Sequence, residues 1–320
     1  MIGWLQDLWD QLTAISVGLL ILGLAFQTAQ TCFVALAWRN ILRAAYPDGG
    51  VRYRRILSYY AGGNGLNAIL PASAGTIAML GLFRADIPGS TVPGLIGATV
   101  VQSLFFAAIS IVLYLCLFLG VAGSFDVKFE WFSDHPVAGI IIVVGGLALV
   151  VLVVRIIWKR FRGVWEQAKE GGGILTTPRK YMVQVVGVEF LSYLARMGVN
   201  ATFMHAYGVP VSVTNVFLIV AASSISSTIA ILPGAVGAQT GLATVVLRGE
   251  APASVISAYT VGQSLITTAW NVLFGFTLLA SVIGWTETKK LVHVRKRKGM
   301  STAEAIAMAA PKPPDGTPSG

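Results

Sequence analysis

Charge is scarce in this 320-residue chain: only 12% of its residues are Asp, Glu, Lys or Arg, and 55% are hydrophobic. A soluble domain carries about 25% charged residues, so this composition excludes an ordinary soluble globular protein. The hydrophobic residues fall in runs of about 20, the length that crosses the hydrocarbon core of a bilayer. Clear runs lie at 12–37, 92–122, 137–158, 181–205 and 253–284. The sequence therefore predicts an all-α, multi-pass membrane protein.

Cysteine and the common catalytic motifs are also scarce. Cys32 and Cys116 both fall inside hydrophobic runs, which excludes a disulfide framework or a cysteine metal site and favours small buried residues. We find no Gly-rich phosphate loop, no His/Cys metal spacing and no Ser/His/Asp arrangement, and the segment GGNG at 62–65 is too short for a phosphate loop. We therefore expect no cofactor, no metal site, no catalytic residues and no enzymatic activity.

The net charge of +9 would suit a nucleic-acid-binding protein, but its distribution does not. The basic residues gather in the predicted loops 39–55 and 155–180 and in the segment 285–299, next to hydrophobic runs. This is the positive-inside pattern, so we place all three segments in the cytoplasm and exclude nucleic acid as a partner. The first 38 residues contain no Lys or Arg, and the loop 123–136 is mainly acidic. We expect a cell (plasma) membrane protein with its N-terminus outside and its C-terminus in the cytoplasm.

Matching landmarks occur in the two halves of the chain. Ala45-Tyr46, Ala68-Ile69-Leu70-Pro71, Gly75, Arg84 and Gln102-Ser103-Leu104 correspond to Ala206-Tyr207, Ala230-Ile231-Leu232-Pro233, Gly237, Arg248 and Gln263-Ser264-Leu265. The offset stays between 161 and 164, and landmarks in one order at one offset indicate a duplication. We place the transmembrane domain at 1–285, with repeats at about 10–122 and 180–285 joined by the span 137–158. Because the charge pattern gives the halves opposite orientations, we expect an inverted-topology repeat.

Each half contains one hydrophobic stretch, 56–84 or 216–248, that is interrupted near its middle by Leu-Pro and then Gly. Proline stops a helix, and glycine permits a sharp reversal of the chain. The charge pattern also requires each stretch to leave the membrane on the side where it entered. Two Pro/Gly-broken, re-entrant helical hairpins satisfy these demands, and so do two pairs of complete short spans.

We predict that the two hairpin tips meet near the membrane midplane and form a lipid site. Helix ends leave backbone N–H groups unpaired, and these suit an anionic phosphate. The predicted substrate-binding residues lie in the broken stretches and in the span 181–205. They are Asn64, Asn67, Pro71, Ser73, Gly75, Arg84, Glu189, Arg196, Pro233, Gly234, Gly237, Gln239 and Arg248.

Each of these residues also has a purely structural interpretation. Pro and Gly can simply kink packed helices, and Asn and Gln commonly join helices inside membranes. Glu189 and Arg196, seven residues apart on one helix face, could contact a lipid headgroup or pair with other helices. Arg84 and Arg248 could hold a phosphate or extend to the membrane interface.

The motifs around the two breaks resemble those of a known family. Leu-Pro-Ala-Ser-Ala-Gly with Arg84, Leu-Pro-Gly-Ala-Val-Gly, and Trp38-Arg39 resemble the lysylphosphatidylglycerol synthase transmembrane-region family over roughly residues 10–285. The resemblance implies translocation of a lipid, with aminoacylated phospholipid or glycan-carrying lipid as cargo. Thr76 and Gln239 stand where members often carry an acidic residue, so recognition of a cationic headgroup is not implied. The family's cytosolic aminoacyltransferase domain is absent from this sequence, so we do not expect it to synthesise the modified lipid.

A flippase acting on a phospholipid or lipid-linked substrate is the favoured interpretation, and two alternatives stay open. A small-solute secondary transporter shares the inverted repeat but usually shows several carboxylates at its ion site, and only Glu189 lies within a span. A membrane enzyme acting on lipid-linked substrates needs an acid/base pair or a metal beside a pocket, and the acidic cluster here lies in the loop 123–136. The segment 286–320 is predicted to be a basic and then disordered cytoplasmic tail, whose basic part suits anionic lipids or only enforces topology. The oligomeric state is not predicted.

Overall fold

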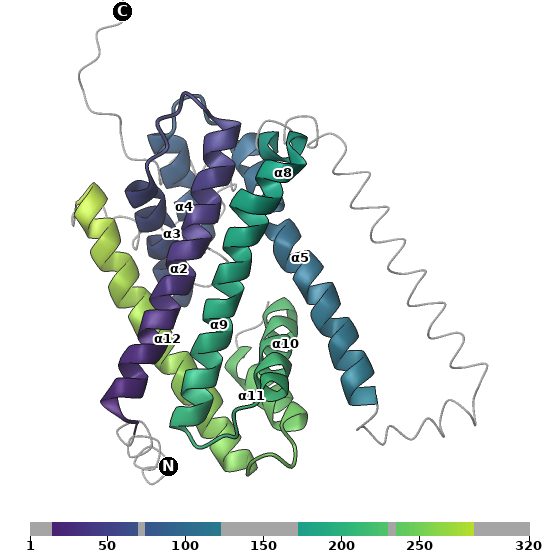
Figure 1. The fold of residues 1–320 in the computed structure, drawn as a ribbon. Helices are drawn as coiled ribbons and strands as arrows, with labels where there is room; N and C mark the ends of the chain where they lie inside the picture. The colour runs from purple at the N-terminus through teal and green to yellow at the C-terminus, as the bar shows by residue number, and fades with distance from the viewer. Residues whose placement is uncertain (1–14, 70–73, 123–171, 230–234, 285–320) are drawn as a thin grey trace, which may run out of the picture.

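The computed structural model describes residues 15–69, 74–122, 172–229 and 235–284, and their regular structure is helical (Figure 1). In chain order the helices are α2 (Val17–Ala45), α3 (Tyr53–Ile69), α4 (Ala74–Asp86), α5 (Val92–Ala122), η1 (Gly173–Thr176), α8 (Pro178–Tyr181), η2 (Met182–Val186), α9 (Gly187–Ala206), α10 (Val213–Ile229), α11 (Ala235–Val246) and α12 (Ala253–Ile283). The expected all-α class is confirmed for these residues. The predicted span 137–158, loop 123–136 and tail 286–320 lie outside them.

Three helical stretches among the described residues are long and hydrophobic enough to cross a membrane. They are α2, the continuous stretch Pro178–Ala206 that joins α8, η2 and α9, and α12, with 29, 29 and 31 residues. At 1.5 Å per residue each is about 43–46 Å long, which exceeds the ~30 Å hydrocarbon core of a bilayer. Large hydrophobic side chains on these helices stay exposed, including Ile21 at 62% and Leu273 at 62%. Such surfaces suit contact with lipid rather than water.

Antiparallel contacts between α2 and α9 form the centre of the bundle. Phe203 lies against Gly23, Phe26 lies against Gly198, and the Asn40 side chain meets the η2 backbone farther along. A second close contact joins α3 to α12. A Cβ atom added at Gly65 of α3 would lie only 3.0 Å from the Asn271 carbonyl oxygen of α12. Glycine at these positions lets backbones approach closely, as is usual for helices packed within a membrane.

The described connections divide between two ends of the bundle, which Figure 1 shows at its top and bottom. At the first end, Gly49 of the α2–α3 connection lies against Ile87 of the α4–α5 connection. At the second end, Asn215 in the first turn of α10 donates a hydrogen bond of 3.1 Å to Glu250 of the α11–α12 connection. The pair α3–α4 therefore starts from and returns to the first end, and the pair α10–α11 does so at the second.

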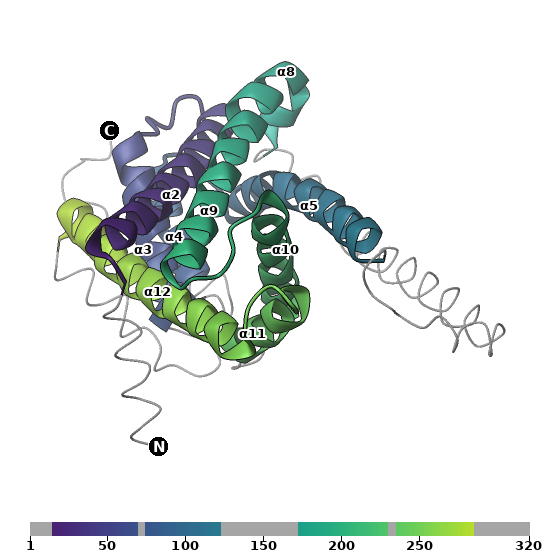
Figure 2. The same cartoon turned by 60° about the horizontal axis from the view of Figure 1, so that its bottom comes forward.

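Contacts within the first half have counterparts within the second. The pairs α3–α4, α4–α5 and α2–α3 correspond to α10–α11, α11–α12 and α9–α10, and all six pairs are in contact. Figure 2 shows α10 and α11 between α12 and α5, and both outer helices contact this pair. The duplication itself and the depth of the two pairs in a bilayer stay predictions.

Two predicted loop boundaries were wrong. Residues 39–45 were placed in the loop 39–55, but α2 continues to Ala45, so Arg39 and Arg43 belong to a helix. Arginine is a good helix former, and the burial of Ile41 and Leu42 extends the packed face of α2 past the last purely hydrophobic turn. At the other predicted loop, Pro178 stands at the start of α8, a position that proline favours, so Lys180 is also helical.

Candidate functional site

Glu189 of α9 is the centre of a buried polar cluster and has 0% of its surface exposed. The Gln102 side chain of α5 donates a hydrogen bond of 3.1 Å to Glu189 Oε1, while Glu189 Oε2 has no hydrogen-bond partner among the residues described. Tyr60 of α3, which lies close to Asn64, and Tyr181 of α8 both lie within electrostatic range of the Glu189 carboxyl group. The cluster therefore joins α3, α5, α8 and α9. A carboxyl group buried among membrane helices is costly, which makes it a default marker of function.

A second polar cluster lies on α9 nearer the second end, around Asn200. Tyr259 and Gln263 of α12 donate hydrogen bonds of 3.0 and 3.2 Å to Asn200 Oδ1. The Asn200 amide donates in turn to the Arg196 carbonyl oxygen at 2.7 Å, and the Arg196 side chain lies near Tyr259. Sequence reasoning missed Asn200 and Tyr259 because their roles depend on a contact between helices far apart in the chain.

The first helix break is held by Asn67 and Gly75. Asn67 Oδ1 accepts hydrogen bonds from the backbone N–H groups of Gly75 at 2.8 Å and Thr76 at 3.3 Å, and its amide donates to Thr76 Oγ1 at 3.1 Å. Asn67 therefore caps the start of α4 across the break, a role typical of asparagine at a helix N-terminus. Gly75 packs so tightly against the Gly63 carbonyl oxygen and Asn67 that a Cβ atom would overlap both. Two of the N–H groups that were expected to meet a phosphate are thus engaged within the protein.

At the second break, Gln239 of α11 donates a hydrogen bond of 3.4 Å to Ser223 of α10. Gly237 lies within α11. Four predicted site residues, Pro71, Ser73, Pro233 and Gly234, lie outside the described residues, so the meeting of the two tips stays a prediction.

The predicted arginine residues do not converge on one place. Arg84 is exposed in the last turn of α4 at the first end, whereas Arg248 is exposed after α11 at the second end. Arg196 lies on α9 between them. Of the two alternatives left open for Glu189, the structure shows a contact with another helix, the hydrogen bond from Gln102. The salt bridge found among the described residues joins Arg55 to Asp86, so it ties α3 to α4 at the first end.

A hydrophobic groove of about 310 Å³ lies between α4 and α5. Its lining residues are Leu80, Ile96, Thr99, Val100, Ser103 and Leu104. Gln102, on the same stretch of α5, points instead to the buried Glu189. This part of α5 thus presents a polar group to the bundle interior and a hydrophobic groove beside it.

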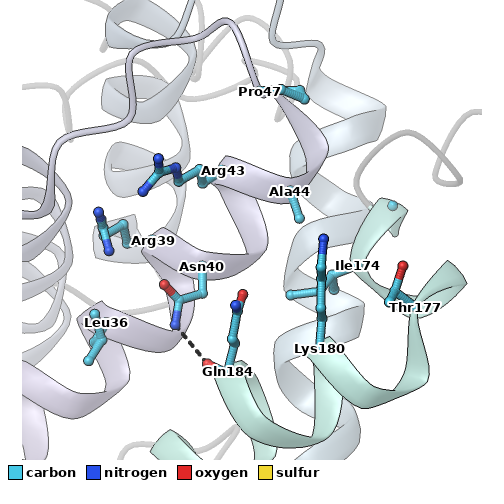
Figure 3. Close-up of a pocket in the computed structure, with 11 residues that line it drawn as sticks. Leu36, Arg39, Asn40, Arg43, Ala44, Pro47, Ile174, Thr177, Lys180 and Gln184 are labelled. Carbon is cyan, nitrogen blue, oxygen red and sulfur yellow. Dashed lines mark hydrogen bonds between the residues drawn. The ribbon is translucent and has the colours of Figure 1, made fainter.

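A larger cavity of about 670 Å³ lies at the first end, between the last turns of α2 and the start of the α8–η2 stretch (Figure 3). Arg39 and Arg43 extend from α2, and Lys180 extends from α8 across from them. Among the residues that the structure describes, the cavity lining contains no Asp or Glu, and Arg39 Nε is buried without a hydrogen-bond partner. We call this the basic cavity. The sequence contained its cations, but we assigned them to loops and did not predict a binding site there.

The described residues contain no group of three or more His, Cys, Asp or Glu side chains that could hold a metal ion.

Long hydrophobic helices with buried polar clusters define a multi-pass, all-α membrane protein. The model of the family described as "Lysylphosphatidylglycerol synthase TM region" matches residues 1–275, so the chain belongs to this family and the predicted resemblance is confirmed. No curated protein and no solved structure matches the chain.

Proposed function

We propose that this protein moves a phospholipid or the headgroup of a lipid-linked substrate between the two leaflets of the cell membrane, with no chemical change to the lipid. The observation that carries the proposal is that α5 offers a polar contact and a hydrophobic groove over the same few residues. Gln102 meets the buried Glu189 in the bundle interior, and the hydrophobic α4–α5 groove lies along the same helical turns. A lipid that changes leaflets needs both surfaces, because its headgroup must leave water while its acyl chains stay in hydrocarbon.

The arrangement of the two interrupted helix pairs supports a route through the whole membrane. The pair α3–α4 belongs to the first end and the pair α10–α11 to the second. In the proposal these are re-entrant elements of an inverted repeat, and small movements of one pair against the rest of the bundle open the route to each side in turn. Non-helical backbone at membrane depth is tolerated where it lines a protein-walled or watery cavity, which fits breaks beside a headgroup route.

The proposal places the first end in the cytoplasm. This end carries most of the described basic residues, namely Arg39, Arg43, Arg52, Arg54, Arg55, Arg84, Arg179 and Lys180. The second end carries Arg248 and His205 and also one acidic residue, Glu250. Lys and Arg concentrate on the cytoplasmic side of membrane proteins, so this distribution supports the orientation expected from the sequence.

Reconstitution into liposomes tests the proposal. Vesicles containing the protein and trace fluorescent phospholipid are treated with a membrane-impermeant quencher, and the loss of the protected inner-leaflet signal gives the translocation rate. We expect a rate at least about tenfold above that of vesicles containing an unrelated multi-pass protein, a difference of about 1.4 kcal/mol in the barrier. Rates no higher than those of the control vesicles for anionic, zwitterionic and lipid-linked-sugar headgroups alike would contradict the proposal.

Filling the α4–α5 groove should slow translocation without unfolding the protein. Ser103 is exposed and lines the groove, so Ser103→Trp places a large ring where an acyl chain is proposed to lie. We expect at least about a fivefold lower rate, a change of about 1 kcal/mol in the barrier. The matched control is Ile21→Trp on the exposed face of α2, outside the groove, which should transport as the wild type does. Equal rates for both variants would exclude the groove from the route.

A further inference from the structure

The basic cavity lies apart from the proposed headgroup route and has a composition of its own. Arg39, Arg43 and Lys180 bring three cations to a space of about 670 Å³ whose described lining residues include no carboxylate. The nearest described salt bridge, between Arg55 and Asp86, belongs to α3 and α4. We propose that this cavity binds the phosphate group of an anionic phospholipid from the leaflet at the first end of the bundle.

The arrangement of cations in the cavity costs free energy in the folded protein, and a bound anion would offset this cost. Arg39 and Arg43 are four residues apart and project from the same face of α2, as Figure 3 shows, and like charges at this spacing destabilise a helix. Arg39 Nε is buried and has no hydrogen-bond partner in the described part of the chain, although it is a strong donor. Buried donors are nearly always paired in folded proteins, so this atom marks an expected acceptor.

The chemistry of the lining selects a phosphate oxygen as that acceptor. A guanidinium group presents its N–H donors in a planar fork that matches two phosphate oxygens, and the Lys180 ammonium adds a third cation from the opposite wall. Thr177 lines the cavity with a hydroxyl group that can also donate. The volume exceeds what a single small ion needs, which suits a phosphate with part of its glycerol headgroup.

The two walls are tied together, so the cavity is preformed. The Asn40 side chain of α2 donates a hydrogen bond of 2.8 Å to the Gln184 carbonyl oxygen of η2, drawn as a dashed line in Figure 3. η2 is a single π-helical turn, from Met182 to Val186. Such turns break the regular helical hydrogen-bond pattern and often occur at functional sites.

The position of the cavity favours a lipid phosphate over a soluble one. Arg39 lies six residues before the end of α2, roughly 9 Å along the helix axis, which suits the headgroup level of a bilayer. Met182 and Val183, next to Gln184, are 56% and 66% exposed and form a hydrophobic border beside the cavity. A lipid can place its phosphate among the cations and its acyl chains against this border. The inference concerns binding alone and does not rest on translocation.

Binding to the purified full-length protein in a neutral detergent tests the inference. The probes are phosphatidylglycerol, phosphatidylcholine and inorganic phosphate, and the readout is the dissociation constant of each. We expect phosphatidylglycerol to bind the wild type, with at least about tenfold weaker binding to the double variant Arg39→Gln/Arg43→Gln. The matched control, Arg52→Gln/Arg54→Gln, loses the same charge at the same end but outside the cavity, and should change the constant less than about twofold.

Each other outcome overturns the inference in a distinct way. Equal weakening in both double variants would mean attraction to a general basic surface, and inorganic phosphate binding as tightly as phosphatidylglycerol would mean a site for a soluble anion. No binding of phosphatidylglycerol to the wild type would exclude the site.

If the glutamine double variant does not fold, two other variants replace it. They are Arg39→Lys/Arg43→Lys and the exposed single variant Lys180→Gln, and each is expected to bind phosphatidylglycerol at least about threefold more weakly than the wild type. If the cavity variants lose phosphatidylglycerol binding but translocate lipid at the wild-type rate, the result supports this site and leaves the proposed function intact. If the wild type binds phosphatidylglycerol but translocates no lipid, the result contradicts only the proposed function.

Discussion

Replacing Glu189 with alanine is expected to lower the rate of lipid translocation in liposomes by about ten- to hundredfold. The substitution removes the only described carboxylate that is fully buried, together with its hydrogen bond to Gln102. Hydrogen bonds to charged groups are worth roughly 1.5–3 kcal/mol, and about 1.4 kcal/mol in a barrier is a tenfold change in rate. The effect should be large because this side chain joins α5, which borders the groove, to the central helix α9.

Glu189→Gln separates charge from polarity at this position. An amide oxygen still accepts the Gln102 hydrogen bond, so this variant should fold as stably as the wild type, measured as thermal unfolding in detergent. Retained translocation in Glu189→Gln would show that the polar contact suffices, and loss in both variants would show that a carboxyl group is required. Wild-type rates in Glu189→Ala would remove this cluster from the route.

Gly75→Leu should both destabilise the protein and abolish translocation. Any Cβ atom at this position would overlap the Gly63 carbonyl oxygen and would lie 2.6 Å from the Asn67 backbone nitrogen, and neither backbone atom can move without shifting its helix. The α3–α4 pair must then separate, and the Asn67 cap on α4 is lost with it. Overpacking of this kind costs roughly 1–3 kcal/mol, and the lost cap adds about 1 kcal/mol. A drop of several degrees in the unfolding temperature is expected, because about 1 kcal/mol shifts it by roughly 2–4 °C in proteins of 150–250 residues.

The matched control is Gly241→Leu in α11, where an added Cβ meets nothing within 4 Å. This variant should unfold at the wild-type temperature. If Gly75→Leu were as stable and as active as Gly241→Leu, the close packing of α3 against α4 would have no part in the mechanism.

Local sequence signals were enough to locate the two helix breaks. Proline and glycine act on the backbone where they stand, so Leu-Pro followed by Gly predicted the ends of α3 and α10 and the starts of α4 and α11. The structure begins α4 at Ala74 and α11 at Ala235, each between the proline and the glycine that interrupt its stretch. The positions of the long membrane helices followed equally from their hydrophobic runs.

Contacts between distant segments could not be predicted in the same way. Nothing in the sequence pairs Gln102 with Glu189, because the partner depends on how α5 packs beside α9. Asn67 was expected to face a ligand, but its hydrogen bonds to Gly75 and Thr76 give it a capping role. Arg39 and Arg43 were placed in a loop because a hydrophobic run gives no measure of how far its helix continues.

The most direct test of the account asks which side of the membrane each helix pair comes from. In a variant whose Cys32 and Cys116 are replaced by alanine, single cysteines are placed at exposed residues of the first end, Asp48 and Ala85, and of the second end, Val211 and Ser254. An impermeant thiol reagent is applied to intact cells and to permeabilised cells. We predict that Val211→Cys and Ser254→Cys react in intact cells, whereas Asp48→Cys and Ala85→Cys react only after permeabilisation. Labelling of all four from one side, or of Asp48→Cys and Ala85→Cys from opposite sides, would contradict two helix pairs that enter the membrane from opposite faces.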